Sequence, residues 1–180
     1  MLLSVLVYVA FAVLLVIAAV GDMRTLRISN KLVGGMFALW CAWHVAMGLG
    51  GLVYGLDFTT ALLAPPPFRG VSLPDGIVGA VALGGGLLLV TTVYEAVSKK
   101  RAMGGGDIKL LAVVGLFLGV QRGVVCLLVA CAASLLFALV LPKTRWANKD
   151  LAVEFGYPIM KEIPFGPAIA IGTAFALLLP

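Results

Sequence analysis

Apolar residues along this chain gather into six long runs that short polar segments separate. The runs cover residues 2–20, 32–49, 77–97, 108–120, 123–141 and 165–179. A helix needs about 20 predominantly apolar residues to cross the hydrocarbon core of a bilayer, and the run at 108–120 is shorter than that. We therefore predict an all-α membrane protein, a bundle of six transmembrane helices, with residues 55–64 at the interface or in a loop.

The first run raises the question of a signal peptide. No Lys or Arg precedes it, and it is longer than the apolar region of such a peptide. We therefore interpret residues 2–20 as a transmembrane helix that the protein retains.

Positive charges are distributed unevenly between the connections of this predicted bundle. Eleven of the 13 basic residues fall around the connections after the first, third and fifth runs, whereas Arg69 and Arg122 fall on the opposite side. Lys and Arg are enriched in cytoplasmic loops. We therefore predict a multi-pass protein of the cell (inner/cytoplasmic) membrane, with these three connections in the cytoplasm and both termini facing outward.

Composition supports the same class of protein and excludes others. The chain is 62% hydrophobic and 12% charged, whereas a soluble domain carries about 25% charged residues. We therefore treat residues 1–180 as a single integral membrane domain. The net charge of +5 comes from the loops that set orientation, so we expect the lipid bilayer and not nucleic acid as a partner. The three cysteines lie in apolar runs without a CxxC pair, so we expect buried, inert thiols, no metal and no cofactor.

Aromatic residues and glycines in the apolar runs also predict how the helices are placed and packed. Trp40 and Trp43, near the end of the second run, fit an aromatic belt at the membrane interface. His44 beside them has no second ligand nearby in sequence, so we interpret it as a belt or packing residue. Glycines 84–86, with Ala80, form a small-residue face that favours close helix packing.

Two acidic residues differ from the other six because they lie at the cytoplasmic edge of apolar runs. Asp22 follows twenty almost wholly apolar residues, and Asp107 opens the run at 108–120. Ionisable groups at such positions are costly to desolvate and are frequently functional. A helix cap would explain Asp107, but not Asp22, which follows a helix C-terminus. Helix capping, pairing with Lys99 and solvation explain other acids: Asp75, Glu95, and the loop residues Asp150, Glu154 and Glu162.

Opposite helix ends distinguish the two candidate carboxylates. Two carboxyl groups held close together share a proton, so that one acts as base and the other as acid. The C-terminal dipole of the first helix favours a protonated Asp22, and the N-terminal dipole of the helix after Asp107 favours its anion. We therefore assign Asp22 as the main acid and Asp107 as the main base. Glycines 104–106 leave the backbone free to adopt positive φ and admit an extended peptide.

Three motifs, in order along the chain, resemble those of a known family. Met103-Gly104-Gly105-Gly106-Asp107-Ile108-Lys109 looks like the GxGD motif of the type IV prepilin peptidases, which are membrane aspartyl proteases. Residues 22–30 are similar to the family's first aspartate motif, and residues 164–167 to its C-terminal signature. The resemblance implies that Asp22 and Asp107 are the catalytic pair. It also implies that seven motif residues support them: Arg24, Asn30, Gly104, Gly106, Lys109, Pro164 and Gly166.

The resemblance implies cleavage of a short basic leader from prepilin-like substrates at the cytoplasmic membrane boundary. The compact chain resembles peptidases of tight-adherence (Flp) pilus systems or archaeal preflagellin peptidases. It lacks the four-cysteine region of longer members, so we expect no N-methylation. The residues alone leave two alternatives open. Paired acids also serve a small membrane transporter or proton relay, and a non-catalytic subunit of a secretion-assembly machine would carry them as solvated charges.

Overall fold

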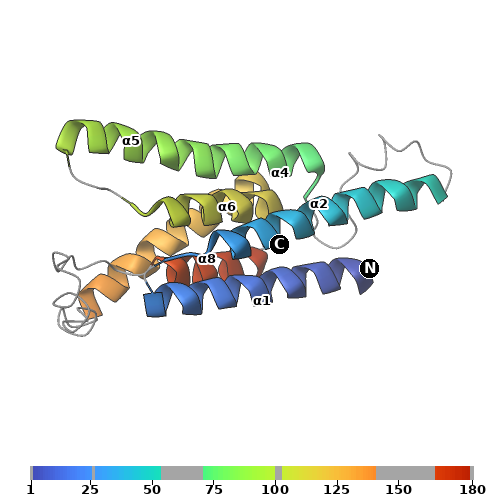
Figure 1. The fold of residues 1–180 in the computed structure, drawn as a ribbon, viewed down its shortest axis with the longest axis horizontal. Coiled ribbons are helices and arrows are strands. Elements are labelled where there is room, and N and C mark those ends of the chain that lie inside the picture. Colours follow the sequence, from blue (N-terminus) through green and yellow to red (C-terminus); the bar gives the residue numbers. More distant parts are fainter. Residues whose placement is uncertain (1, 26, 54–70, 100–102, 141–164, 179–180) are drawn as a thin grey trace.

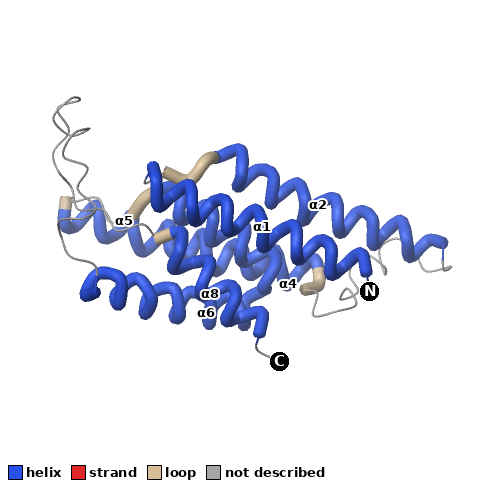
Figure 2. The backbone as a smooth tube through the Cα atoms, turned by 90° about the horizontal axis from the view of Figure 1, so that it is seen from below, coloured by secondary structure: helices blue, strands red, loops and turns tan. Residues whose placement is uncertain are grey.

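Helices make up every regular element of the described chain. The computed structural model describes residues 2–25, 27–53, 71–99, 103–140 and 165–178, and these ranges contain no strand (Figures 1 and 2). The elements are α1 (Leu2–Thr25), α2 (Asn30–Val53), α4 (Leu73–Ala80), the π-helical segment η1 (Val81–Gly85), α5 (Gly86–Ser98), α6 (Gly105–Val140) and α8 (Gly166–Leu178). The predicted all-α class is confirmed for these residues.

Four helical stretches are long and apolar enough to cross a membrane. They are Leu3–Thr25, Asn30–Val53, Leu73–Ser98 and Gly105–Leu139. The third of these stretches contains α4, η1 and α5, and α8 is a shorter apolar helix of 13 residues. The predicted interface or loop segment at 55–64 lies outside the described residues.

The longest helix, α6, breaks at Gly119, where φ is 69° and ψ is −174°. Glycine adopts positive φ without the steric cost of a side chain. A Cβ on Gly84 would lie 2.5 Å from the Cβ of Ala112, and a Cβ on Gly123 would lie 2.5 Å from Cδ1 of Leu83. A straight helix would separate residues 112 and 123 by about 16 Å. The two parts of α6 therefore run in opposite directions, as the yellow and orange ribbons do in Figure 1.

Hydrogen bonds from two other helices stabilise the turn at Gly119. The last carbonyls before a helix break have no partner within the helix, and such carbonyls are costly in lipid. Trp40 Nε1 donates to the carbonyl of Leu116 at 3.0 Å, and the Tyr8 hydroxyl donates to that of Phe117 at 3.4 Å. This turn separates the fourth and fifth apolar runs that the sequence predicts.

Glycines let α4 and η1 approach the first part of α6 closely. A Cβ on Gly76 or Gly79 would lie 2.6 Å or 2.5 Å from a backbone oxygen of α6. Gly84 makes a similarly close approach, so the predicted small-residue face is confirmed there. Gly85 and Gly86 are exposed instead. The packing face therefore continues toward the start of α4 and not along the run of three glycines.

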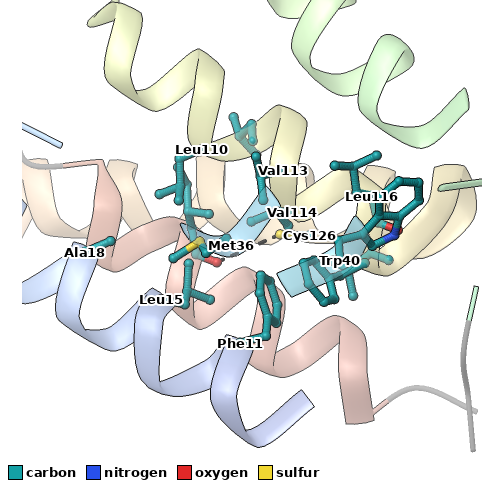
Figure 3. Close-up of a cluster of buried hydrophobic side chains, with 14 of the residues drawn as sticks. Phe11, Leu15, Ala18, Met36, Trp40, Leu110, Val113, Val114, Leu116 and Cys126 are labelled. Atoms are coloured by element: carbon teal, nitrogen blue, oxygen red, sulfur yellow. Dashed lines mark hydrogen bonds between the residues drawn. The ribbon is translucent and has the colours of Figure 1, made fainter. Parts of the chain in front are cut away.

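The hydrophobic core lies where α1, α2, α8 and both parts of α6 meet (Figure 3). The rings of Phe11 and Phe117 stack with their centroids 4.0 Å apart. Met36 from α2 and Ile169 from α8 are fully buried beside them. α1 and α2 lie side by side in Figure 2, and α8 contacts both α1 and α6. This core joins the helices whose ends carry the candidate acids.

Three expectations about single residues were wrong. Trp40 and Trp43 are only 6% and 5% exposed, so they belong to the core and not to an interfacial belt. The N-cap of α4 is Ser72, whose Oγ accepts a hydrogen bond from the backbone N–H of Asp75 at 3.4 Å. Asp75 therefore lies in the first turn and is not the cap itself. Cys131 is exposed on α6, although all three thiols were expected to be buried.

His44 packs in the interior as the sequence analysis expects. Its ring lies 4.3 Å from that of Trp40, and its Nδ1 is 3.1 Å from the Trp40 carbonyl. Because a carbonyl only accepts, Nδ1 carries the proton of this bond. Among the described residues, no group of three or more His, Cys, Asp or Glu residues could hold a metal ion.

Candidate active site

Asp22 lies near the end of α1 and is directed into the bundle. Leu15, Ala18 and Asp22 are spaced three and four residues apart, so they share one face of the helix. All three are buried, and Asp22 is only 5% exposed. The residues that follow it in α1, including Arg24, are exposed. The position of Asp22 therefore excludes a carboxylate that is merely solvated at the membrane surface.

The first residue of α8 holds the Asp22 carboxylate. The backbone N–H of Gly166 donates to Asp22 Oδ2 at 2.8 Å, and this bond is buried. The first N–H groups of a helix have no partner within the helix and carry partial positive charge, so they stabilise an anion. A Cβ on Gly166 would lie 2.9 Å from Oδ2 and 3.0 Å from the Cβ of Asp22. Glycine at this position thus permits the direct bond.

Asp107 lies in the first turn of α6 and is half-buried. Its backbone N–H donates to the Gly104 carbonyl at 3.1 Å. A Cβ on Gly104 would lie 3.1 Å from Asp107 Oδ2, so the carboxylate sits against a position without a side chain. The sequence leaves glycines 104–106 free to adopt positive φ, but Gly119 is the only glycine with positive φ in the described ranges. These glycines therefore provide close approach rather than an unusual backbone conformation.

The connection between α1 and α2, together with the first residue of α2, contacts the residues of α6 that flank Asp107. A Cβ on Gly106 would lie 3.1 Å from the Cβ of Ile28, so this glycine lets α6 lie against the connection. Lys109 Nζ donates to Asn30 Oδ1 at 3.2 Å. The element that follows Asp22 is thus attached to the element that carries Asp107.

The structure brings the three sequence motifs to one end of the bundle. α8 meets Asp22 through Gly166, and the α1–α2 connection meets α6 through the contacts of Gly106 and Lys109. These ends lie toward the left of Figure 1. Of the other predicted supporting residues, Arg24 is exposed on the last turn of α1, and Pro164 lies outside the described residues.

Both candidate carboxylates lie at helix N-termini. Asp107 belongs to the first turn of α6, and Asp22 meets the first N–H of α8. The proposed division of roles assumed that Asp22 meets only the C-terminal end of α1. Because the α8 N-terminus stabilises negative charge at Asp22 as well, helix dipoles no longer distinguish an acid from a base. The arrangement provides two carboxyl groups at one end of the helical bundle, and a backbone N–H fixes that of Asp22.

A comparison with protein-family models matches residues 9–139 to the type IV leader peptidase family. The match covers more than half of the chain and includes both Asp22 and Asp107. The chain belongs to the type IV leader peptidase family. This finding confirms the resemblance drawn from the three motifs.

The names of the curated relatives combine two activities, those of a prepilin leader peptidase and an N-methyltransferase. The prepilin leader peptidase/N-methyltransferase of Pectobacterium carotovorum subsp. carotovorum is 31% identical over 165 residues, which are 92% of this chain and 48% of the relative. The protein of the same name from Bacillus subtilis is 30% identical over 170 residues, 94% of this chain and 54% of the relative. The chain thus spans about half the length of these curated relatives. No solved structure matches it.

Ile28, which was not among the predicted site residues, also contacts the elements of the candidate site. A Cβ on Gly106 would lie 3.1 Å from the Cβ of Ile28, so the Ile28 side chain sets the spacing between the α1–α2 connection and α6. An isoleucine in a chain that is 62% hydrophobic carries no distinctive signal. Only its place inside the first aspartate motif, residues 22–30, could have indicated a role.

Proposed function

We propose that this chain is a prepilin leader peptidase of the aspartic type, in which Asp22 and Asp107 activate a water molecule. The observation that carries the proposal is the buried Asp22 carboxylate, held by the first N–H of α8 at 2.8 Å. Burying an acid at the end of a membrane bundle is costly, and acids at such positions are usually functional. Family membership and the names of the relatives support the substrate class.

The proposed chemistry uses one ionised and one protonated carboxyl group. The carboxylate removes a proton from water as the water oxygen attacks the scissile carbonyl carbon. The carboxylic acid protonates the carbonyl oxygen and so stabilises the tetrahedral intermediate. Collapse of this intermediate breaks the C–N bond: the leaving nitrogen takes the proton that the first carboxylate removed from water, and a hydroxyl of the intermediate gives its proton to the second carboxylate. We leave the starting proton unassigned between Asp22 and Asp107, because each lies at a helix N-terminus.

The proposed topology has six membrane-crossing segments, with both termini outward and the carboxylates at the cytoplasmic face of the inner membrane. The reversal of α6 at Gly119 supports two crossings within that helix. α8 would supply the sixth with a length of about 20 Å. Charge supports the orientation, because eleven of the 13 basic residues belong to the side that carries the candidate acids. A prepilin-like substrate in the bilayer would present its leader at that face.

Cleavage of a prepilin in membranes tests the proposal. The chain is co-expressed with a candidate prepilin, and loss of the leader is followed by gel mobility. Asp22→Asn and Asp107→Asn keep the shape of each side chain but remove its acid, so each should abolish cleavage at normal protein levels. Asp75→Asn, an exposed acid in the first turn of α4, is the matched control and should cleave normally. Retained cleavage in either of the first two variants would refute the aspartic mechanism and favour a transporter or assembly role.

A further inference from the structure

A tertiary hydrogen bond connects the two elements that carry the candidate acids. Lys109 Nζ donates to Asn30 Oδ1 at 3.2 Å. Lys109 lies two residues after Asp107 in α6, and Asn30 is the first residue of α2, directly after the connection from α1. The two partners are 79 residues apart in the sequence. The bond therefore fixes one element against another and is not part of local helix structure.

Lys109 and Asp107 lie on different faces of α6. Residues two apart in an α-helix differ by about 200° around the axis, so their side chains do not face each other. Lys109 is exposed, whereas Asp107 is half-buried. The ammonium group is directed to Asn30 on α2. The hydrogen bond of Lys109 to Asn30 therefore acts on Asp107 through the position of α6.

A second contact lies on the other side of Asp107. Gly106 is so close to the α1–α2 connection that a Cβ on it would lie 3.1 Å from Ile28 Cβ and 3.6 Å from Ile28 N. This apolar contact limits how near α6 can come, but it does not prevent rotation or separation. The Lys109–Asn30 bond supplies the directional restraint that the apolar contact lacks.

We propose that Asn30 and Lys109 form a positioning pair that fixes the first turn of α6, and with it Asp107, relative to Asp22. The proposal rests on the proposed peptidase function. A water molecule between two carboxyl groups reacts well only in a narrow range of geometry, and a displacement of about 1 Å can cost about 100-fold in rate. An exposed hydrogen bond contributes little to folding. The pair therefore affects the rate of cleavage more than the stability of the fold.

Paired substitutions in the full-length chain test this role in reconstituted vesicles with a prepilin substrate. Asn30→Leu and Lys109→Met remove the bond but keep side-chain size, and each should lower kcat about tenfold with KM and the pH profile unchanged. The double variant should be no slower than either single variant. Asn30→Asp and Lys109→Arg keep an acceptor and a donor and should restore most of the rate. Lys31→Met, an exposed neighbour on α2, is the control and should match the wild type.

Several results would overturn the positioning pair. Unchanged kcat in Asn30→Leu and Lys109→Met would do so, as would a double variant whose loss is the product of the two single losses. A pH profile shifted in Lys109→Met but not in Asn30→Leu would instead assign Lys109 a direct electrostatic effect on the acids. A wild-type chain that does not cleave prepilin would refute the proposed function itself. Thermal unfolding of each variant shows whether a lower rate of cleavage comes from a less stable protein.

Discussion

Replacing Gly166 with alanine should separate the Asp22 carboxylate from the helix end that holds it. The new Cβ would lie 2.9 Å from Oδ2 of Asp22 and 3.0 Å from its Cβ, whereas ordinary contacts begin at 3.4 Å. Either the first turn of α8 or the end of α1 must therefore move by about 0.5 Å. Because the N–H···O distance is now 2.8 Å, a shift of that size lengthens and misaligns the bond.

The size of the effect follows from the kind of bond that is lost. A hydrogen bond to a charged group contributes roughly 1.5–3 kcal/mol. If the Gly166 N–H stabilises the reacting carboxyl group by this amount, its loss slows cleavage roughly 10- to 150-fold, because each 1.36 kcal/mol corresponds to a factor of ten. Because the bond holds a carboxylate of the protein and not the prepilin, we expect the loss in kcat and little change in KM.

Initial rates of leader cleavage by purified variants in vesicles measure this effect. Gly21→Ala is the matched control, because Gly21 precedes Asp22 on α1 and a Cβ there meets nothing within 4 Å. It should cleave at the wild-type rate. A Gly166→Ala enzyme with wild-type kcat, or an equal loss in both variants, would refute the reasoning. Thermal unfolding in the same detergent shows whether Gly166→Ala remains folded.

Two further predictions concern packing and orientation. Gly79→Ala should lower thermal stability by about 1–3 kcal/mol through overpacking, because its new Cβ would lie 2.5 Å from the Gly115 carbonyl oxygen. A Cβ on Gly86 meets nothing within 4 Å, so the control Gly86→Ala should unfold like the wild type. In a chain without its native cysteines, Ser29→Cys should react with an impermeant thiol reagent only from the cytoplasmic side. Asp75→Cys should react only from the outer side. The reverse pattern would contradict the proposed orientation.

Much of the fold followed from the sequence because hydropathy is a local property. Long apolar runs predict membrane helices whatever their neighbours are, and four such stretches plus the shorter α8 are present in the described residues. Asp22 and Asp107 could be selected because each interrupts or borders such a run. The three motifs then predicted the family, which the comparison with residues 9–139 confirmed.

The sequence could not predict which face of each helix packs. α1, α2 and α6 are apolar on all sides, so periodicity does not separate a core-facing side from a lipid-facing one. The interfacial reading of Trp40 and Trp43 was wrong for this reason. The predicted packing face at glycines 84–86 was only partly right, because Gly84 packs against α6 whereas Gly85 and Gly86 are exposed.

By itself, the sequence determined the class of protein and the approximate helices, and it predicted two candidate acids at one membrane face. Only the tertiary structure decided what holds them. The Gly166 N–H meets Asp22 across 144 residues, and Lys109 meets Asn30 across 79. Such contacts depend on how helices pack and where α6 turns, which no local pattern encodes. The structure thereby gave Asp22 a helix N-terminus of its own and removed the dipole argument for unequal roles.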